Sequence, residues 1–358
     1  MGAVHAQRPP QRILLAQTSF LGDVVLTTAL ARRLLEAFPA AEVHWLVRPD
    51  AREIITPLVG PERVLVYAKR AEDAGYRGLL RLAERLAARR FDVGIAVQRS
   101  LRTALVLRLA RIPLRIGFSR APGALFYNKR VAYVGAHARD RLVALAAGLG
   151  VDVAAPPLPR LQVDEASAAS VQARLAAAGV EDTRPLVVLA PAAAWETKRW
   201  PPRHFAALAE RLLGQGFGHA LVVGAPGDGG LAAAIRAEVP AVAARILDWT
   251  GATTLAELIA LIDRAALVVA NDSAPGHIAA ALGKPLVSCF GPTVAEQGFA
   301  PLGASVALVG RDDLACRPCS RHGTRVCPIG THECLEGLEV EGVLAACARV
   351  FENAGERR

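Results

Sequence analysis

Three short segments each place side chains that can do chemistry directly after an apolar run typical of a β-strand. "SFLGDVVLTT" holds Asp23 behind a glycine, "PAAAWETKRWPP" holds Lys198 and Arg199, and "NDSAPGH" opens a helix-like stretch. A carboxylate at such a turn can accept a proton, and a cation can neutralise a leaving diphosphate. A helix N-terminus can bind phosphate oxygens through its backbone N–H groups. These loops follow strands, which is where α/β proteins bind their ligands.

The segment "NDSAPGH" has two interpretations. Pro275 suits the first turn of a helix that Asp272 or Ser273 can cap, which would make the segment a simple helix start. Alternatively, the N–H groups of this helix start bind a diphosphate, helped by the helix dipole. Asp272 would then accept a hydrogen bond from a hydroxyl. His277, one turn into the helix, would donate to a phosphate oxygen or serve a structural role.

Lys198 and Arg199 lie between Trp195 and Trp200, in the loop after the strand-like run "PLVVLA". A cation there could stabilise the charge that develops on a departing diphosphate. The two cations could equally be a solvated surface pair that packs over tryptophan. A third loop, "GAPGDGG", carries Asp228 but lacks the spacing of a dinucleotide-binding glycine motif.

Strand-like and helix-like segments alternate along the chain, which predicts parallel, doubly wound sheets. The alternation stops at "GVDVAAPPLPRLQVDE", whose three prolines mark a linker, and then restarts. We therefore expect an α/β protein with two Rossmann-like domains that face a common cleft. The expected divisions are a disordered lead over 1–11, an N-terminal domain over 12–160, a linker with a first helix over 161–184, a C-terminal domain over 185–335, and a C-terminal helix over 336–358 that could pack back on the N-terminal domain.

The blocks "SFLGDVVLTTAL", "KRWPPRHFAAL" and "NDSAPGHIAAALGKPLVSCFGPT", in this order and spacing, resemble glycosyltransferase family 9. This is the family of the ADP-heptose–lipopolysaccharide heptosyltransferases, and the likeness runs from about Arg12 to Val350. The resemblance implies a GT-B fold, with an acceptor site in the N-terminal domain and a nucleotide-sugar site in the C-terminal domain. It also implies inversion at the anomeric carbon, with no metal ion or other cofactor.

By this resemblance Asp23 matches the proposed catalytic base, and Lys198 matches the lysine near the diphosphate. Asp272, Ser273 and His277 match the donor-binding loop. The donor site expected from the resemblance also includes Ala193, Ala194, Asp228, Thr253 and Ala274.

The chain departs from the family pattern at several of these positions. Ala274 stands where glycine is usual, and Gly276 stands where a larger residue is usual. Residues 192–194 are all alanine where small or hydroxylated residues are expected. Because these changes keep the backbone N–H groups and remove hydroxyl contacts, the donor class is better supported than the exact donor.

Asp23 itself has two interpretations. As a base it would take the proton of the attacking acceptor hydroxyl, on the face opposite the leaving diphosphate. As a structural residue it would cap the following helix, where Gly22 frees the turn. For the acceptor we expect contacts from Arg99, Arg102 and Arg120 to phosphates or carboxylates.

Positive charge is concentrated in the N-terminal half. Through Glu165 the chain has 25 Lys and Arg against 14 Asp and Glu, a net +11, and the remainder has 17 against 19, a net −2. This asymmetry indicates an acidic partner for the first half, or a general bias toward arginine. The i+4 arginines of "RGLLRLAERLAARR" form either a solvated helix face or a face toward an acidic membrane leaflet. Nucleic acid is not indicated, because no nucleic-acid-binding motif is present.

Four cysteines near the C-terminus, Cys316, Cys319, Cys327 and Cys334, have the spacing C-x2-C-x7-C-x6-C. One CxxC pair suits a zinc knuckle, but the second half lacks the matching short spacing. A structural zinc site therefore competes with reduced thiols or a local disulfide.

No run reaches the roughly 18 apolar residues of a membrane span, and the polar start "MGAVHAQRPPQR" lacks a signal-peptide core. We expect a cytoplasmic protein that associates peripherally with the inner leaflet of the inner membrane. The resemblance implies transfer of heptose from ADP-L-glycero-D-manno-heptose to an acidic glycolipid, the lipid A–core acceptor of lipopolysaccharide. The alternatives are a family-9 enzyme with another sugar nucleotide or acceptor, and a catalytically silent nucleotide-sugar-binding protein.

Overall fold

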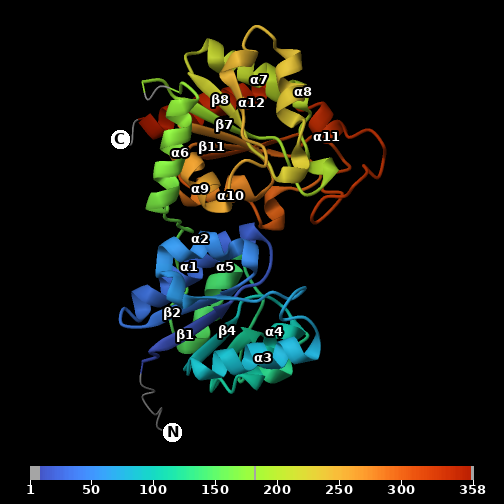
Figure 1. The fold of residues 1–358 in the computed structure, drawn as a ribbon. Helices are drawn as coiled ribbons and strands as arrows, with labels where there is room; N and C mark the ends of the chain where they lie inside the picture. The colour runs from blue at the N-terminus through green and yellow to red at the C-terminus, as the bar shows by residue number, and fades with distance from the viewer. Residues whose placement is uncertain (1–8, 181–182, 356–358) are drawn as a thin grey trace. The chain divides into compact units, whose positions relative to one another are not determined.

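The computed structural model describes residues 9–180 and 183–355, and the chain divides into two compact units, Met1–Pro159 and Arg160–Arg358 (Figure 1). The boundary falls in the proline-rich segment that was predicted as a linker, one residue from the expected end of the first domain. The disordered lead predicted over 1–11 lies mostly outside the described residues.

The first unit is a parallel six-stranded sheet with the order β3-β2-β1-β4-β5-β6. Helices cover both faces of the sheet, so the side chains of its central strands are buried on either side. These strands are therefore short, continuous apolar runs. Helices α1, α2 and α5 cover one face, and α3 and α4 cover the other (Figure 1). The strands are β1 (Arg12–Ala16), β2 (Glu42–Val47), β3 (Val64–Val66), β4 (Val93–Ala96), β5 (Leu114–Phe118) and β6 (Lys129–Val131). The helices are α1 (Leu21–Ala37), α2 (Arg52–Val59), α3 (Gly75–Ala88), α4 (Leu101–Leu109) and α5 (Ala138–Val143).

The second unit repeats this topology, because its order β12-β11-β10-β7-β8-β9 has the same connectivity when it is followed from β9. Helices α7, α8 and α12 lie on one face of this sheet, and α6, α9 and α10 lie on the other (Figure 1). The strands are β7 (Leu186–Ala190), β8 (His219–Val222), β9 (Ile246–Asp248), β10 (Leu267–Asn271), β11 (Leu286–Phe290) and β12 (Val306–Gly310). The helices are α6 (Glu165–Ala177), α7 (Pro202–Gly214), α8 (Leu231–Glu238), α9 (Leu255–Arg264), α10 (Ala274–Ala281), α11 (Glu333–Glu336) and α12 (Val340–Gly355).

In both sheets the strand order reverses direction at one place, between β1 and β4 in the first unit and between β7 and β10 in the second. Doubly wound sheets bind ligands at the carboxyl ends of the strands beside such a switch point. The prediction of two Rossmann-like domains is therefore confirmed, and the topology marks one candidate site in each unit.

The C-terminal helix α12 packs in the core of the second unit, against α7 and strands β11 and β12. Its buried stripe includes Val343, Ala346, Cys347 and Val350. The apolar stripe of this helix therefore completes the core of its own unit, and its packing on the N-terminal domain stays a prediction. None of the described helices is long and apolar enough to cross a membrane.

Candidate functional site

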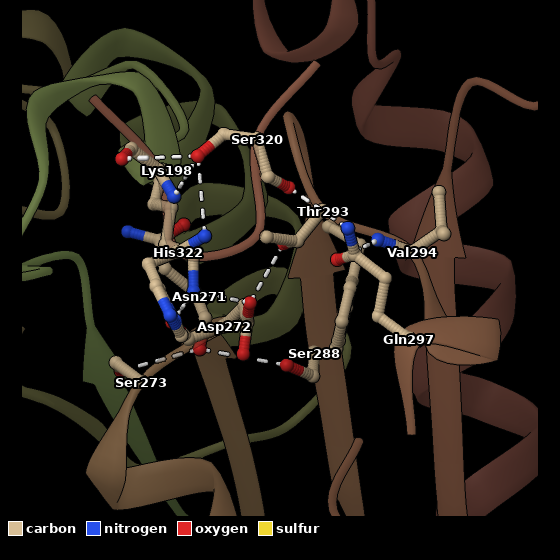
Figure 2. A network of polar contacts seen from close by, with 12 residues as sticks. Lys198, Asn271, Asp272, Ser273, Ser288, Thr293, Val294, Gln297, Ser320 and His322 are labelled. Atoms are coloured by element: carbon tan, nitrogen blue, oxygen red, sulfur yellow. Dashed lines mark hydrogen bonds and ion pairs between the residues drawn. The ribbon is translucent and has the colours of Figure 1, made fainter. Parts of the chain in front are cut away.

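At the switch point of the second sheet, Lys198 and Asp272 form an ion pair with 2.5 Å between Lys198 Nζ and Asp272 Oδ2 (Figure 2). Lys198 follows β7 in a short 3-10 turn, and Asp272 directly follows β10. The side chains are only 13% and 12% exposed. Lys198 is therefore a largely buried, oriented cation, and the solvated-pair interpretation is wrong for it.

Asn271, at the end of β10, ties the two switch-point loops together. Its side chain is fully buried, its Nδ2 donates to the Pro191 carbonyl at 2.7 Å, and its Oδ1 accepts from the Trp200 backbone N–H at 3.1 Å. A buried amide with both ends bonded fixes the loop that carries Lys198 relative to the strand that carries Asp272. Asn271 was not predicted from the sequence, although it precedes a predicted site residue.

Asp272 has a further partner that the sequence analysis missed. Thr293, in the turn after β11, donates from Oγ1 to Asp272 Oδ2 at 2.7 Å (Figure 2). The only signal in the sequence is the "FGPT" block at the end of a predicted strand, and nothing in that block indicates a contact with Asp272.

The helix α10 begins beside this ion pair, with Ser273 at its N-cap and Pro275 in its first turn. The Ser273 hydroxyl donates to the Asn271 carbonyl at 3.2 Å and makes no capping bond. The simpler interpretation included a cap by Ser273, but this side chain does not cap the helix. Its first-turn N–H groups and its dipole form an environment suited to an anion. Ala274 is the first residue of the helix, and His277 is buried one turn further along.

The remaining predicted donor residues lie in neighbouring loops at the same edge of the sheet. Arg199 donates to the Ala193 carbonyl at 2.9 Å and pairs with Asp228 at 3.2 Å, so it joins the loops after β7 and β8. Ala194 is exposed in the first of these loops, and Thr253 is half-buried in the loop between β9 and α9.

The loops after β8 and β9 are packed closely against each other. The Gly251 N–H donates to the Gly224 carbonyl at 2.9 Å. Gly251 has φ +69°, and a Cβ there would lie 2.7 Å from the Cα of Pro226, so glycine is required by both conformation and space. This packing fixes the loop of Thr253 beside that of Asp228.

In the first unit, Asp23 lies in the first turn of α1, after the loop that follows β1. The N-cap residue of α1 is Phe20, so the structure places Asp23 inside the helix and not at the capping position that the structural interpretation assumed. A carboxylate in a first turn is favoured by the helix dipole. Asp23 therefore lies at the carboxyl edge of the first sheet, beside its switch point.

Gln98 joins the two switch-point loops of the first sheet. Its Oε1 accepts from Ser19 Oγ at 2.7 Å, and its Nε2 donates to Thr103 Oγ1 at 2.9 Å and also to Thr18 Oγ1. Like Asn271, it is an amide that bridges neighbouring loops, and it was not predicted from the sequence. These bonds fix the segment that leads into Asp23.

The three arginines predicted at the acceptor follow β4 and β5, at the same edge of the sheet. Arg99 is exposed, lies over the Tyr133 ring and donates to the carbonyl of Arg120, which is itself exposed. Arg102 donates to the carbonyls of Asp73 and Gly75, at 2.6 and 3.2 Å. Arg102 therefore has a structural role in addition to any role in binding.

A further cation that the sequence analysis missed is Lys69, after β3. Its ammonium donates to the Thr18 carbonyl at 3.3 Å, beside the loop of Asp23. Burial lowers the pKa of Lys69, and the charges of Arg102 and Arg48 act in the same direction. The carboxyl edge of the first sheet is therefore rich in positive charge.

The four C-terminal cysteines lie in or beside a long segment that follows β12, and none of them is in a disulfide. Within residues 9–180 and 183–355, no three His, Cys, Asp or Glu side chains are grouped so that they could hold a metal ion. The arrangement therefore does not support the zinc interpretation. The segment instead packs on the lysine loop, where Thr197 Oγ1 donates to the Thr324 carbonyl at 2.9 Å and accepts from the Thr324 N–H at 2.8 Å.

The chain is similar to known proteins in sequence and in fold. The model of glycosyltransferase family 9 (heptosyltransferase) matches residues 79–329. Lipopolysaccharide heptosyltransferase 2 of Salmonella typhimurium is 30% identical over 298 residues, which cover 79% of this chain and 83% of that protein. Lipopolysaccharide heptosyltransferase 1 of Pseudomonas aeruginosa is 31% identical over 325 residues, 86% of each chain. The solved structure of Escherichia coli ADP-heptose lipopolysaccharide heptosyltransferase II has the same fold, with a TM-score of 0.78 at 22% identity over 96% of this chain and 100% of that one.

Proposed function

The chain belongs to glycosyltransferase family 9, the heptosyltransferases, and we propose that it transfers heptose from ADP-L-glycero-D-manno-heptose to the lipopolysaccharide inner core. The observation that carries the proposal is the Lys198–Asp272 pair beside the start of α10. A largely buried cation next to a helix N-terminus suits a diphosphate, the leaving group of a nucleotide sugar. The names of the two relatives support this choice of sugar and acceptor.

In the proposed reaction, the acceptor oxygen attacks the anomeric carbon of the donor from the face opposite the diphosphate. The new glycosidic bond forms as the bond to the diphosphate breaks, so the configuration is inverted and ADP leaves. Negative charge then grows on the departing diphosphate, where Lys198 and the first N–H groups of α10 would stabilise it. His277 would donate to a phosphate oxygen, and Asp272 would accept a hydrogen bond from a donor hydroxyl.

Asp23 would take the proton that the acceptor hydroxyl loses as it attacks. Its position in the first turn of α1, at the switch point of the first sheet, supports this role. Such proton transfer contributes roughly 10²–10⁴ in rate when the base is well placed. We further propose that no metal ion takes part, because Lys198 and the dipole of α10 can offset the charge of the diphosphate.

The acceptor would be an acidic glycolipid, bound by the cations at the carboxyl edge of the first sheet. Arg99 and Arg120 are exposed there, which leaves their guanidinium groups accessible to phosphates or carboxylates. We propose that the enzyme works in the cytoplasm at the inner leaflet of the inner membrane, where such a lipid would be presented. The exposed arginines of α3, Arg77 and Arg81, support attraction to an acidic leaflet.

A panel of nucleotide sugars tests the proposal. ADP-heptose, ADP-glucose, UDP-glucose and GDP-mannose would each be measured for binding by calorimetry and for transfer to lipid A–core acceptors that lack heptose. We expect binding and transfer with ADP-heptose. Transfer from another sugar nucleotide alone would favour a different family-9 specificity, and binding without transfer to any acceptor would favour the silent binding protein.

A further inference from the structure

Thr293 makes a contact that the proposed roles do not explain. The residue is only 3% exposed, and its hydroxyl donates to Asp272 Oδ2 at 2.7 Å. The same oxygen lies 2.5 Å from Lys198 Nζ. One carboxylate oxygen thus joins a hydroxyl from the end of β11 to the ammonium that follows β7, as Figure 2 shows.

The backbone of Thr293 is itself held in place by a buried arginine. Arg317 has a side chain only 4% exposed, and its guanidinium donates to the Gly291 carbonyl at 2.6 Å. It also donates to the carbonyls of Phe290 and Thr293, each at 3.2 Å. Gly310 leaves room for this group, because a Cβ there would lie 2.7 Å from Arg317 Nη2. The Arg317 guanidinium therefore fixes the turn that carries the Thr293 hydroxyl through hydrogen bonds to three backbone carbonyls.

We propose, resting on the proposed function, that Thr293 is a positioning residue for Lys198. A lysine ammonium sits on a flexible four-carbon stem, so its place depends on the anion that holds it. The hydroxyl of Thr293 fixes the Asp272 carboxylate, and the carboxylate in turn holds the ammonium beside the first turn of α10. Thr293 acts through Asp272 and does not itself touch the donor.

Removal of the hydroxyl leaves Asp272 Oδ2 with the mobile ammonium alone, and the carboxylate can then rotate. Misplacement of a charge by a fraction of an ångström weakens its interaction with a diphosphate, most strongly in the transition state. We expect Thr293→Val to lower kcat/KM for the donor about tenfold, the scale of a hydrogen bond to a charged group. The acceptor KM should stay unchanged.

A merely structural hydroxyl would give a different pattern of results. The comparison uses Thr293→Val, Thr293→Ser, which keeps the hydroxyl, and Thr28→Val as the matched control. Thr28 is also buried, with a hydroxyl that donates to the Val25 carbonyl at 2.7 Å in α1 of the other unit. We expect Thr293→Ser to restore donor use, and Thr28→Val to leave ADP affinity by calorimetry at the wild-type value.

A double-mutant cycle with Asp272→Ala gives the decisive result. If Thr293 acts through Asp272, Thr293→Val should change donor kcat/KM no further once Asp272 is alanine. Equal loss in Thr293→Val and Thr293→Ser, wild-type kinetics in Thr293→Val, or additive effects in the cycle would each overturn the proposal. Lys198→Ala in the same assays distinguishes the positioning role of Thr293 from the proposed function. If Lys198→Ala loses donor use while Thr293→Val has normal kinetics, the positioning role is refuted and the proposed function is left intact.

Discussion

Replacement of Lys198 by alanine should separate the binding role of this cation from its structural role. The side chain is largely buried and pairs with Asp272 at 2.5 Å, so its removal affects the folded protein even without a donor. Asp272 would retain the hydrogen bond from Thr293 and its remaining contact with solvent. We therefore expect a loss of about 1 kcal/mol in the free energy of unfolding, well below the cost of stranding a fully buried charge.

The effect on the donor should be larger than the effect on stability. A hydrogen bond to a charged group is worth about 1.5–3 kcal/mol, which corresponds to roughly a 10- to 150-fold loss of ADP affinity. In the double variant Lys198→Ala/Asp272→Asn, the unpaired carboxylate is also removed. Stability should then return toward that of the wild type, while ADP affinity stays low.

Calorimetry with ADP and thermal unfolding measure these two effects separately. Lys284→Ala is a matched control, since Lys284 pairs with Asp263 at 3.7 Å in the same unit but precedes β11, at the opposite edge of the sheet. It should leave ADP affinity unchanged. Wild-type ADP affinity in Lys198→Ala, or recovery of affinity together with stability in the double variant, would refute the assignment of Lys198 to the diphosphate.

Three further predictions concern the base, the metal and the acceptor. Asp23→Asn should lower kcat by roughly 10²–10⁴ and leave ADP affinity unchanged. The control Glu36→Gln, at an exposed position of the same helix, should retain activity. Normal turnover in Asp23→Asn with saturating acceptor would exclude the base role. Activity should survive EDTA, and a loss that a divalent ion restores would show that a metal takes part. Arg99→Ala should raise the acceptor KM about tenfold, an effect that added salt reduces, and leave ADP binding unchanged. Equal damage to both substrates would contradict the division of roles between the units.

The sequence was sufficient to predict the two Rossmann-like units, because buried parallel strands leave continuous apolar runs that alternate with helices. The proline-rich segment was equally clear in the sequence, and the boundary between the two units falls in it, after Pro159. The packing of α12 was not predictable, because an amphipathic helix shows which side is apolar but not which core receives that side.

The site was predictable only where its residues lie in the local motifs. Lys198 and Asp272 were identified, but their ion pair depends on β7 lying next to β10. The Thr293 contact similarly depends on β10 lying next to β11. No periodicity in the sequence determines this strand order. Asn271, Gln98 and Arg317 were missed for the same reason, since their partners lie on loops far away in the sequence.

The most direct test of the central claim is transfer to a defined acceptor. The purified protein would be incubated with ADP-heptose and a lipid A–core acceptor that lacks the heptose, without added metal, and the glycolipid analysed by mass spectrometry and NMR. We predict a gain of one heptosyl residue, release of one ADP per transfer, and an anomeric configuration opposite to that of the donor. An unchanged glycolipid with ADP-heptose bound, or a product that retains the donor's configuration, would contradict the account.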